Sequence, residues 1–205
     1  AYLHNVPGLS ENFIYFNDDF FIARALPSSH FFRSNGIASL FVSDKKINEM
    51  IIKGRKTATL TACVNCNLIL KSEYNVCFNN TLTHTYVPLK KSVYINAHDF
   101  FEKEIKEFSQ NKFRSSNDLN MATFLVPYMQ YILAKSTPET DICSYFNIRS
   151  PHAYLHYQNL LIAKLENNLP HSFCANDFSS AEFGNSDYAI KLGSFLAEFY
   201  DVKLT

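Results

Sequence analysis

The feature that most constrains the fold is a set of short β-rich runs that stop at Asn-Asp steps. Residues 13–16 (FIYF) end at Asn-Asp-Asp, residues 20–22 (FFI) follow, and residues 172–175 (SFCA) end at Asn-Asp. Short runs of aromatic and β-branched residues bounded by turn formers predict buried strands. Polar residues at the ends of such strands would lie at the edge of a sheet, where open α/β folds bind ligands.

Most of the remaining chain carries apolar residues at helical spacing, as Val93, Ala97, Phe101 and Ile105 do. We expect helices at residues 45–52, 57–70, 88–108, 115–133, 151–167 and 186–200, an irregular stretch at 28–44 and a loop at 79–85. Pro88 suits the first turn of a helix, Ser115 or Ser116 the cap of the next, and Pro127 should kink that one. The alternation of helices and strands predicts a mixed α/β fold, a mixed sheet with flanking helices.

Composition excludes several classes of protein. The chain has 205 residues, of which 47% are hydrophobic, so it is globular. Its 19 basic and 19 acidic residues balance, which argues against a large nucleic-acid or anionic-membrane surface. No apolar run approaches the roughly 20 residues of a membrane-spanning helix. An odd number of cysteines, five, without a secretory signal indicates reduced thiols in a cytoplasmic protein.

The Asn-Asp steps are candidates for a metal site. Asp18 and Asp19, with Asn17 beside them, follow one strand, and Asn176 and Asp177 follow another. Carboxylates with a nearby amide suit Mg²⁺ or Mn²⁺, hard cations that prefer oxygen ligands and often bridge to phosphates. The alternative is that Asn-Asp simply forms a turn after a strand.

Two further segments are candidates for phosphate chemistry. Arg114 lies four residues before Asp118 at an expected helix start, and a guanidinium at a helix N-terminus is a good anion site. His84 lies in a polar loop, where a histidine can act as a general base or phosphate donor. An ordinary helix cap with a solvated arginine, and a histidine without a role, are the alternatives.

The thiols allow a competing hypothesis. Cys63, Cys66 and Cys77, together with His84, could form a structural zinc site. However, Cys63 and Cys66 fall within an expected helix, whereas structural CxxC pairs usually lie on turns.

Three segments together resemble the Stealth family. Residues 3–19 (LHNVPGLSENFIYFNDD) are similar to its second conserved region. The stretch from His84 to the FRSSNDL motif at residues 113–119 is similar to the third, and residues 173–177 (FCAND) to the start of the fourth. The family includes bacterial capsule and exopolysaccharide phosphotransferases and the animal enzyme that tags lysosomal hydrolases with N-acetylglucosamine-1-phosphate.

The resemblance implies one catalytic domain over residues 1–205, with a partial GT-A or Rossmann-like core. Its second, third and fourth regions would cover residues 1–24, 82–136 and 171–200. The family's first region, with an Asp-rich turn, has no counterpart in this sequence, so we expect the chain to be an internal fragment.

The reaction implied by the resemblance moves a sugar-1-phosphate from a UDP-sugar, a UDP-N-acetylhexosamine or UDP-hexose, to a hydroxyl of a growing capsule glycan, releasing UMP. It implies Asp18, Asp19 and Asp177 as metal ligands and Asn17 and Asn176 as substrate-binding residues. It further implies a catalytic group formed by His84, Arg114 and Asp118.

The implied location is the cytoplasm, with peripheral association at the inner face of the membrane and no nucleic-acid partner. Two other functions stay open: a metal-dependent glycosyltransferase that releases UDP, and a non-catalytic zinc-stabilised binding module.

Overall fold

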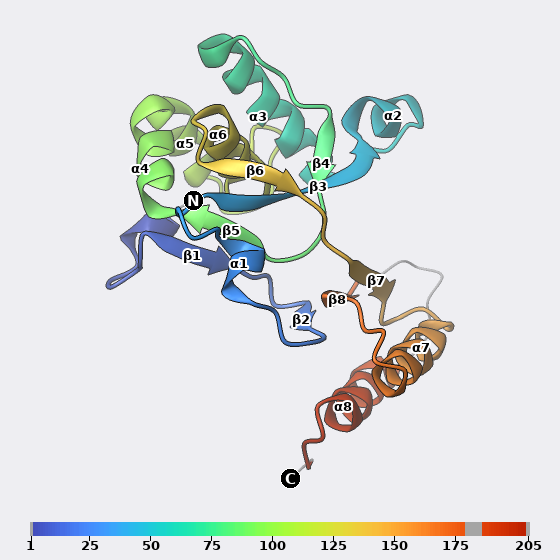
Figure 1. The fold of residues 1–205 in the computed structure, drawn as a ribbon. Coiled ribbons are helices and arrows are strands. Elements are labelled where there is room, and N and C mark those ends of the chain that lie inside the picture. The colour runs from blue at the N-terminus through green and yellow to red at the C-terminus, as the bar shows by residue number, and fades with distance from the viewer. Residues whose placement is uncertain (1, 179–185, 204–205) are drawn as a thin grey trace. The chain divides into compact units, whose positions relative to one another are not determined.

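The computed structural model describes residues 2–178 and 186–203 (Figure 1). They form two compact units. Unit 1 contains the described residues up to Phe16 together with Pro27–Asp141, and unit 2 contains Asn17–Leu26 together with the described residues from Ile142 onward. Each unit combines strands with helices, which confirms the mixed α/β class and is consistent with part of a GT-A-like core.

Strand β3 (Ala38–Lys46) organises unit 1. It pairs antiparallel with β4 (Asn80–Leu82) and parallel with β6 (Ser136–Glu139), and Figure 1 shows it between them. A separate antiparallel pair joins β1 (Asn12–Tyr15) to β5 (Val87–Lys90). The first four residues of β3 are all buried, as in a strand that is covered on both faces.

The predicted irregular stretch at residues 28–44 is wrong, because it contains helix α1 (Ser28–Phe31) and most of β3. Asn35 and Gly36 do form a turn, as their residue types indicate, but the turn is confined to a few residues. Gly36 has a φ of +78° and donates its N–H to Arg33 O at 2.8 Å, so the turn is complete before the strand begins. The predicted loop at 79–85 is wrong in part for a similar reason, since it includes β4.

The helical segments of unit 1 only partly match the predicted ones. They are η1 (Leu3–Asn5), α1, α2 (Ile47–Ile52), α3 (Ala58–Tyr74), α4 (Lys91–Phe100), α5 (Glu102–Ser109), the π-helical turn η2 (Met121–Leu125) and α6 (Val126–Ile132). The predicted helices at 45–52 and 57–70 correspond to α2 and α3.

The single helix predicted at residues 88–108 is wrong. Pro88 lies in β5, opposite Ile14 of β1, and not in the first turn of a helix. Helix α4 begins only at Lys91, and the backbone leaves helical geometry at Phe101 (φ −118°, ψ 35°) before α5 starts. Apolar spacing alone cannot separate these elements, because β5 and both helices contribute to one continuous core.

The predicted cap at Ser115 or Ser116 is also wrong. The N-cap is Asn120, whose side-chain Oδ1 accepts from Thr123 N at 3.3 Å and from Thr123 Oγ1 at 2.6 Å. Pro127 is the second residue of α6 and follows the π-helical turn η2 closely, so it lies in the first turn of a helix and not within a longer one as predicted.

The core of unit 1 lies between the strands and helices α3, α4 and α6. Its fully buried side chains include Leu70 from α3, Leu89 from β5, Tyr94 from α4, Phe124 from η2 and Met129 from α6. These segments are far apart in the sequence, so their packing in one core holds the ends of the loops that connect them.

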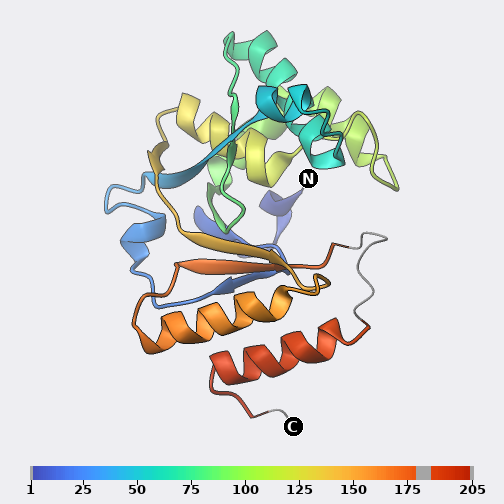
Figure 2. The same ribbon diagram turned by 90° about the vertical axis from the view of Figure 1, so that its right-hand side faces the viewer.

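Unit 2 is built on a sheet of order β2-β8-β7. Strand β2 (Phe20–Ile22) pairs antiparallel with β8 (Ser172–Asn176), and β7 (Cys143–Asn147) pairs parallel with β8. Helix α7 (Ala153–Leu165) connects the parallel strands, and it lies beside α8 (Tyr188–Phe199) on one side of the sheet (Figure 2). The strand predictions for β2 and β8 are confirmed, whereas β7 was not predicted.

Aromatic side chains dominate the core of unit 2. Phe173 of β8 is fully buried and stacks on Phe21 of β2, with ring centroids 5.1 Å apart. Tyr157 of α7 stacks on Phe195 of α8 at 4.6 Å. The predicted helices at 151–167 and 186–200 are therefore confirmed to within a few residues, while residues 179–185 of the expected fourth region lie outside the described part of the chain.

Candidate active site

The ends of three strands meet at one edge of the unit 2 sheet. Because β7 and β8 are parallel, Asn147 and Asn176 are register partners at their carboxyl ends. Because β2 runs antiparallel to β8, the residues that precede Phe20 lie at the same edge. Asp19 therefore meets Asn176, and Asn17, Asp18 and Asp177 lie at the same edge, as the sequence predicts for the two Asn-Asp steps.

Asp19 is held directly against β8. Its Oδ2 accepts hydrogen bonds from Asn176 Nδ2 at 2.9 Å and from Cys174 Sγ at 3.1 Å, and its backbone O accepts from Ala175 N at 2.9 Å. Burial raises the pKa of the Cys174 thiol, and its hydrogen bond to the Asp19 carboxylate raises it further. Cys174 therefore stays a protonated donor to the Asp19 carboxylate.

Asp18 and Asn17 lie in the tight turn that precedes β2. Asn17 O accepts from Phe20 N at 3.4 Å, and Asp18 is exposed next to the half-buried Asp19. The turn interpretation is thus correct for the backbone, but the turn also presents two adjacent carboxylates at the sheet edge. Oxygen ligands of this kind fit Mg²⁺ or Mn²⁺.

Asp177 has a different environment. Arg149, in the turn after β7, donates from Nε to Asp177 Oδ1 and from Nη2 to Asp177 Oδ2, the latter at 3.0 Å. The same Nη2 lies 2.7 Å from Tyr188 Oη at the start of α8. The hydrogen bond from Arg149 holds the pKa of the Asp177 carboxyl below its usual value.

Sequence reasoning missed Arg149, although a signal was present. The run Tyr145-Phe146-Asn147 is a third aromatic segment that ends in Asn, like those that end at Asn17 and Asn176. Recognising it as a strand would have placed Arg149 at the same sheet edge.

In unit 1, Arg114 and Asp118 come together at one pocket. An open pocket of about 400 Å³ is lined by both residues and by Lys112, Phe113 and Tyr2 among others. The Asp118 carboxylate accepts from Ser115 N at 2.9 Å and from Asn111 Nδ2 at 3.0 Å, so it closes the loop and does not cap a helix. Arg114 is exposed in this loop.

His84 is exposed on a different loop of unit 1, between β4 and β5. That loop is anchored to β3, because Thr83 N donates to Phe41 O at 2.8 Å. The loop of Arg114 is instead anchored to α3, where Asn65 Nδ2 donates to Ser116 O and Asp118 O.

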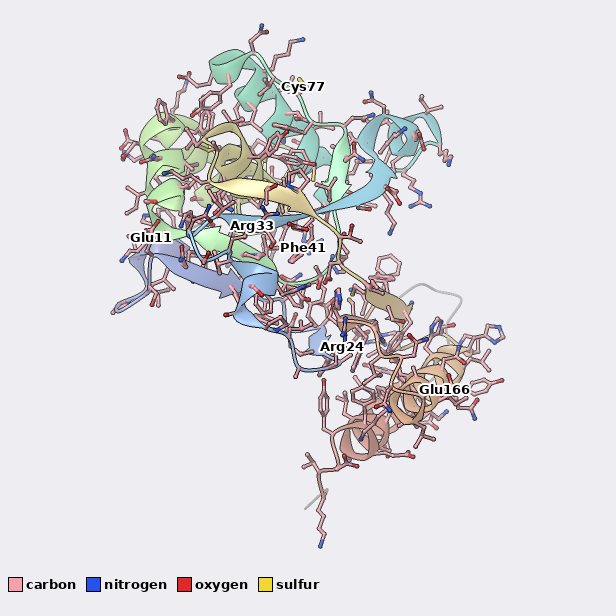
Figure 3. All side chains as sticks on the ribbon, in the orientation of Figure 1. Glu11, Arg24, Arg33, Phe41, Cys77 and Glu166 are labelled. Atoms are coloured by element: carbon pink, nitrogen blue, oxygen red, sulfur yellow. The ribbon has the colours of Figure 1, made fainter. Side chains whose placement is uncertain are left out.

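The thiols do not support the zinc hypothesis. Cys63 and Cys66 are buried in α3, where Cys63 Sγ accepts from Asn120 Nδ2 at 3.5 Å and Cys66 Sγ accepts from Asn120 N at 3.2 Å. Cys77 is exposed at the surface of unit 1 (Figure 3). Among the residues that the structure describes, these three thiols belong to no group of side chains whose ligand atoms lie close enough together to hold one metal ion.

Comparison with known proteins decides the family. The family profile of Stealth protein CR3, conserved region 3, matches residues 83–131. A capsular polysaccharide phosphotransferase, LcbA, from Neisseria meningitidis is 51% identical over 202 residues, which is 98% of this chain and 55% of that protein. The chain belongs to the Stealth family.

Two other relatives carry phosphotransferase names. A capsular polysaccharide phosphotransferase from Actinobacillus suis is 50% identical over 98% of this chain and 54% of its own length. The exopolysaccharide phosphotransferase CpsY of Mycobacterium tuberculosis is 29% identical over 98% of this chain and 37% of its own length. The chain thus spans about half the length of the capsular phosphotransferases.

The CR3 match lies within the segment expected for the third Stealth region and includes His84, Arg114 and Asp118. Within residues 2–178 and 186–203, no helix has both the length and the apolar character needed to cross a bilayer.

Proposed function

We propose that this chain forms much of the catalytic region of a Stealth phosphotransferase, which transfers a sugar-1-phosphate from a UDP-sugar to a hydroxyl of a capsule glycan. The observation that carries the proposal is the identity of about half of the residues, over nearly the whole chain, with capsular polysaccharide phosphotransferases. The meeting of Asp19 and Asn176 at the sheet edge supports it, because donor diphosphates need a polar, cation-binding site.

The proposed reaction is substitution at the phosphorus that carries the sugar. The acceptor hydroxyl oxygen forms a bond to this phosphorus, and the bond to the bridging oxygen of the diphosphate breaks. UMP leaves with that oxygen, and the sugar keeps its anomeric phosphate as part of a phosphodiester. The hydroxyl proton must pass to a base, and His84 is the residue that we assign to accept it.

The carboxylates of Asp18 and Asp19 are the proposed metal ligands, with Asp177 a further candidate. The donor set fits, because these side chains and the amides of Asn17 and Asn176 offer oxygen atoms at one sheet edge, and Mg²⁺ and Mn²⁺ prefer oxygen. A bound ion would offset the charge of the diphosphate. Asn176 orients Asp19 through their hydrogen bond, and the two amides would also contact the substrate.

Arg114 is the proposed phosphate-binding cation of unit 1. Its planar guanidinium can donate two parallel hydrogen bonds to phosphate oxygens. Asp118 holds the loop in shape through Ser115 and Asn111, so it acts on Arg114 by positioning the backbone around it.

The proposed donor is a UDP-N-acetylhexosamine or UDP-hexose, and the proposed acceptor is the growing capsule glycan. The proposed location is the cytoplasm, at the inner face of the membrane, with peripheral association.

Product analysis tests the reaction class. The intact protein that carries this chain is incubated with Mg²⁺, an oligosaccharide acceptor and each of a panel of UDP-sugars, and the nucleotides are separated. We expect UMP, together with a new phosphodiester signal in phosphorus NMR. Release of UDP, with a product that contains no phosphorus, would instead establish a glycosyltransferase.

A further inference from the structure

A cation that the proposed reaction has not used lies at the site edge in unit 2. We propose that Arg149 binds a phosphoryl oxygen of the substrate and that Asp177 and Tyr188 hold its guanidinium in position. The identity of the substrate rests on the proposed function, whereas binding of a phosphate anion by Arg149 can be measured separately.

The guanidinium of Arg149 is fixed from three directions. Its Nε and Nη2 form a paired contact with the two carboxylate oxygens of Asp177, and Nη2 also contacts Tyr188 Oη at 2.7 Å. The guanidinium carbon lies 4.0 Å from the centroid of the Tyr188 ring. An arginine that is already ordered loses little side-chain entropy when it binds a ligand.

Arg149 retains donors for a ligand. A guanidinium carries five N–H groups, and the contacts to Asp177 and Tyr188 leave both hydrogens of Nη1. No atom of the described residues accepts a hydrogen bond from Nη1, and the Arg149 side chain is 28% exposed. The N–H groups of a guanidinium suit the oxygens of a phosphate.

The position of Arg149 links this cation to the proposed site. Arg149 follows β7 by two residues, and Ile148 N, between them, donates to Asn176 O at 3.0 Å. Asn176 in turn donates to Asp19, so the cation and the proposed metal ligand belong to one hydrogen-bonded edge. Arg149 therefore places a positive charge next to the carboxylates of this edge.

The same contacts give Asp177 a different role from the predicted one. Both of its carboxylate oxygens accept hydrogen bonds from Arg149. Of the three candidate metal ligands, Asp177 is the one whose two carboxylate oxygens already accept from Arg149, so we assign it to positioning Arg149.

Binding without metal tests the proposal. The intact protein is titrated calorimetrically with inorganic pyrophosphate in EDTA, first as the wild type and then as Arg149→Lys, Arg149→Ala, Asp177→Asn and Tyr188→Phe. We expect Arg149→Ala and Arg149→Lys to weaken binding about tenfold or more, since charge-assisted hydrogen bonds contribute this much. Asp177→Asn and Tyr188→Phe should weaken it less. Arg24→Ala is the matched control, because Arg24 is an exposed arginine of the same unit (Figure 3).

The concentration of Mg²⁺ that gives half-maximal activity separates the two roles of Asp177. If Asp177 positions Arg149, Asp177→Asn raises the KM of the UDP-sugar without changing the Mg²⁺ requirement. An unchanged pyrophosphate affinity in Arg149→Lys and Arg149→Ala, or a raised Mg²⁺ requirement in Asp177→Asn with normal pyrophosphate binding, would overturn the proposal. Arg149→Lys and Tyr188→Phe preserve charge or shape, so they remain informative if Arg149→Ala unfolds.

Different results would contradict the role of Arg149 and the phosphotransferase function. Absence of UMP release with every UDP-sugar would contradict the phosphotransferase function while leaving the pyrophosphate result intact. Normal UMP release with an unchanged KM in Arg149→Ala would contradict only the role of Arg149.

Discussion

Gln130 completes the hydrogen bonding of strand β5 through Lys90. The side-chain Oε1 of Gln130 accepts from Lys90 N at 2.6 Å, and its Nε2 donates to Pro88 O at 3.1 Å. Gln130 is fully buried in α6, so one side chain takes the place of a neighbouring strand. This contact fixes β5, and with it the end of the loop that carries His84.

Replacing Gln130 should destabilise unit 1. In Gln130→Leu the N–H of Lys90 and the carbonyl of Pro88 are buried without partners, which costs about 1–3 kcal/mol for each group. Thermal and urea unfolding followed by circular dichroism measure the loss. Gln158→Leu, at an exposed position of α7, is the matched control and should change stability by less than about 0.5 kcal/mol. Equal stability of the two variants would show that the amide contacts are unimportant.

Loss of the Asp19 carboxylate should abolish transfer. In the intact protein we expect Asp19→Asn, which keeps the shape of the side chain, to lower UMP release by at least ~10²-fold because charge stabilisation at the diphosphate is lost. Asp18→Ala should act in the same direction. Asp201→Asn removes a carboxylate of the same unit that is 82% exposed, and it should leave the rate unchanged. Full activity of the wild type in EDTA would rule out the metal role.

His84 should affect the rate more than binding. If it is the base, His84→Ala lowers the transfer rate by about 10²–10⁴-fold, the usual range for general base catalysis, with little change in KM. The wild-type rate should fall on acidification, because a protonated imidazole cannot accept the proton, and this dependence should disappear in the variant. His152→Ala, at an exposed histidine, is the control. A wild-type rate and pH profile in His84→Ala would exclude His84 as the base.

The buried thiols should make unit 1 less stable in alkali. Burial raises the pKa of Cys63 from about 9 to about 11, against a smaller opposite effect of its hydrogen bond with Asn120. The unfolded chain then ionises at lower pH than the folded one, so stability is intact below pH 9 and declines as the pH approaches 11. For Cys63 the decline is about 2–3 kcal/mol.

Unfolding by urea at several pH values measures this decline. The double variant Cys63→Ala/Cys66→Ala should show a flatter dependence between pH 9 and 11, even though each substitution lowers stability at neutral pH. Cys77→Ala, which changes an exposed thiol, should retain the wild-type slope. If stability declined equally steeply with pH in the wild type, the double variant and Cys77→Ala, the buried thiols would not be the cause of the decline.

Much of the fold could be predicted where one signal dominates a segment. The aromatic runs of β1, β2 and β8 are examples, and so is α7, which begins two residues after Pro151. Strand β3 could not be found in this way, because Ser43 and Asp44 resemble loop residues while long-range pairing with β4 and β6 determines their conformation. Pro88 was misplaced for a related reason, since the partner that satisfies its carbonyl, Gln130, is 42 positions away.

The candidate site, like the fold, could be predicted from the sequence only in part. The sequence predicts that Asp19 and Asn176 lie at a common sheet edge, because both follow or precede recognisable strands. It does not predict the pairing of Arg149 with Asp177, since β7 was not recognised and a guanidinium contact across 28 positions leaves no local pattern. The roles of the individual carboxylates stay predictions until the variants are measured.

Strand β2 has a consequence for how the protein is made. Asp19 and Cys174 are 155 positions apart, yet they contact each other in the finished sheet. On the ribosome, β2 emerges long before β8, and contacts of such large separation form late because the intervening loop must first be closed. The edge that carries the proposed metal ligands is therefore assembled only after β8 has been synthesised, so a product terminated before β8 carries Asp18 and Asp19 without the β8 partners of Asp19.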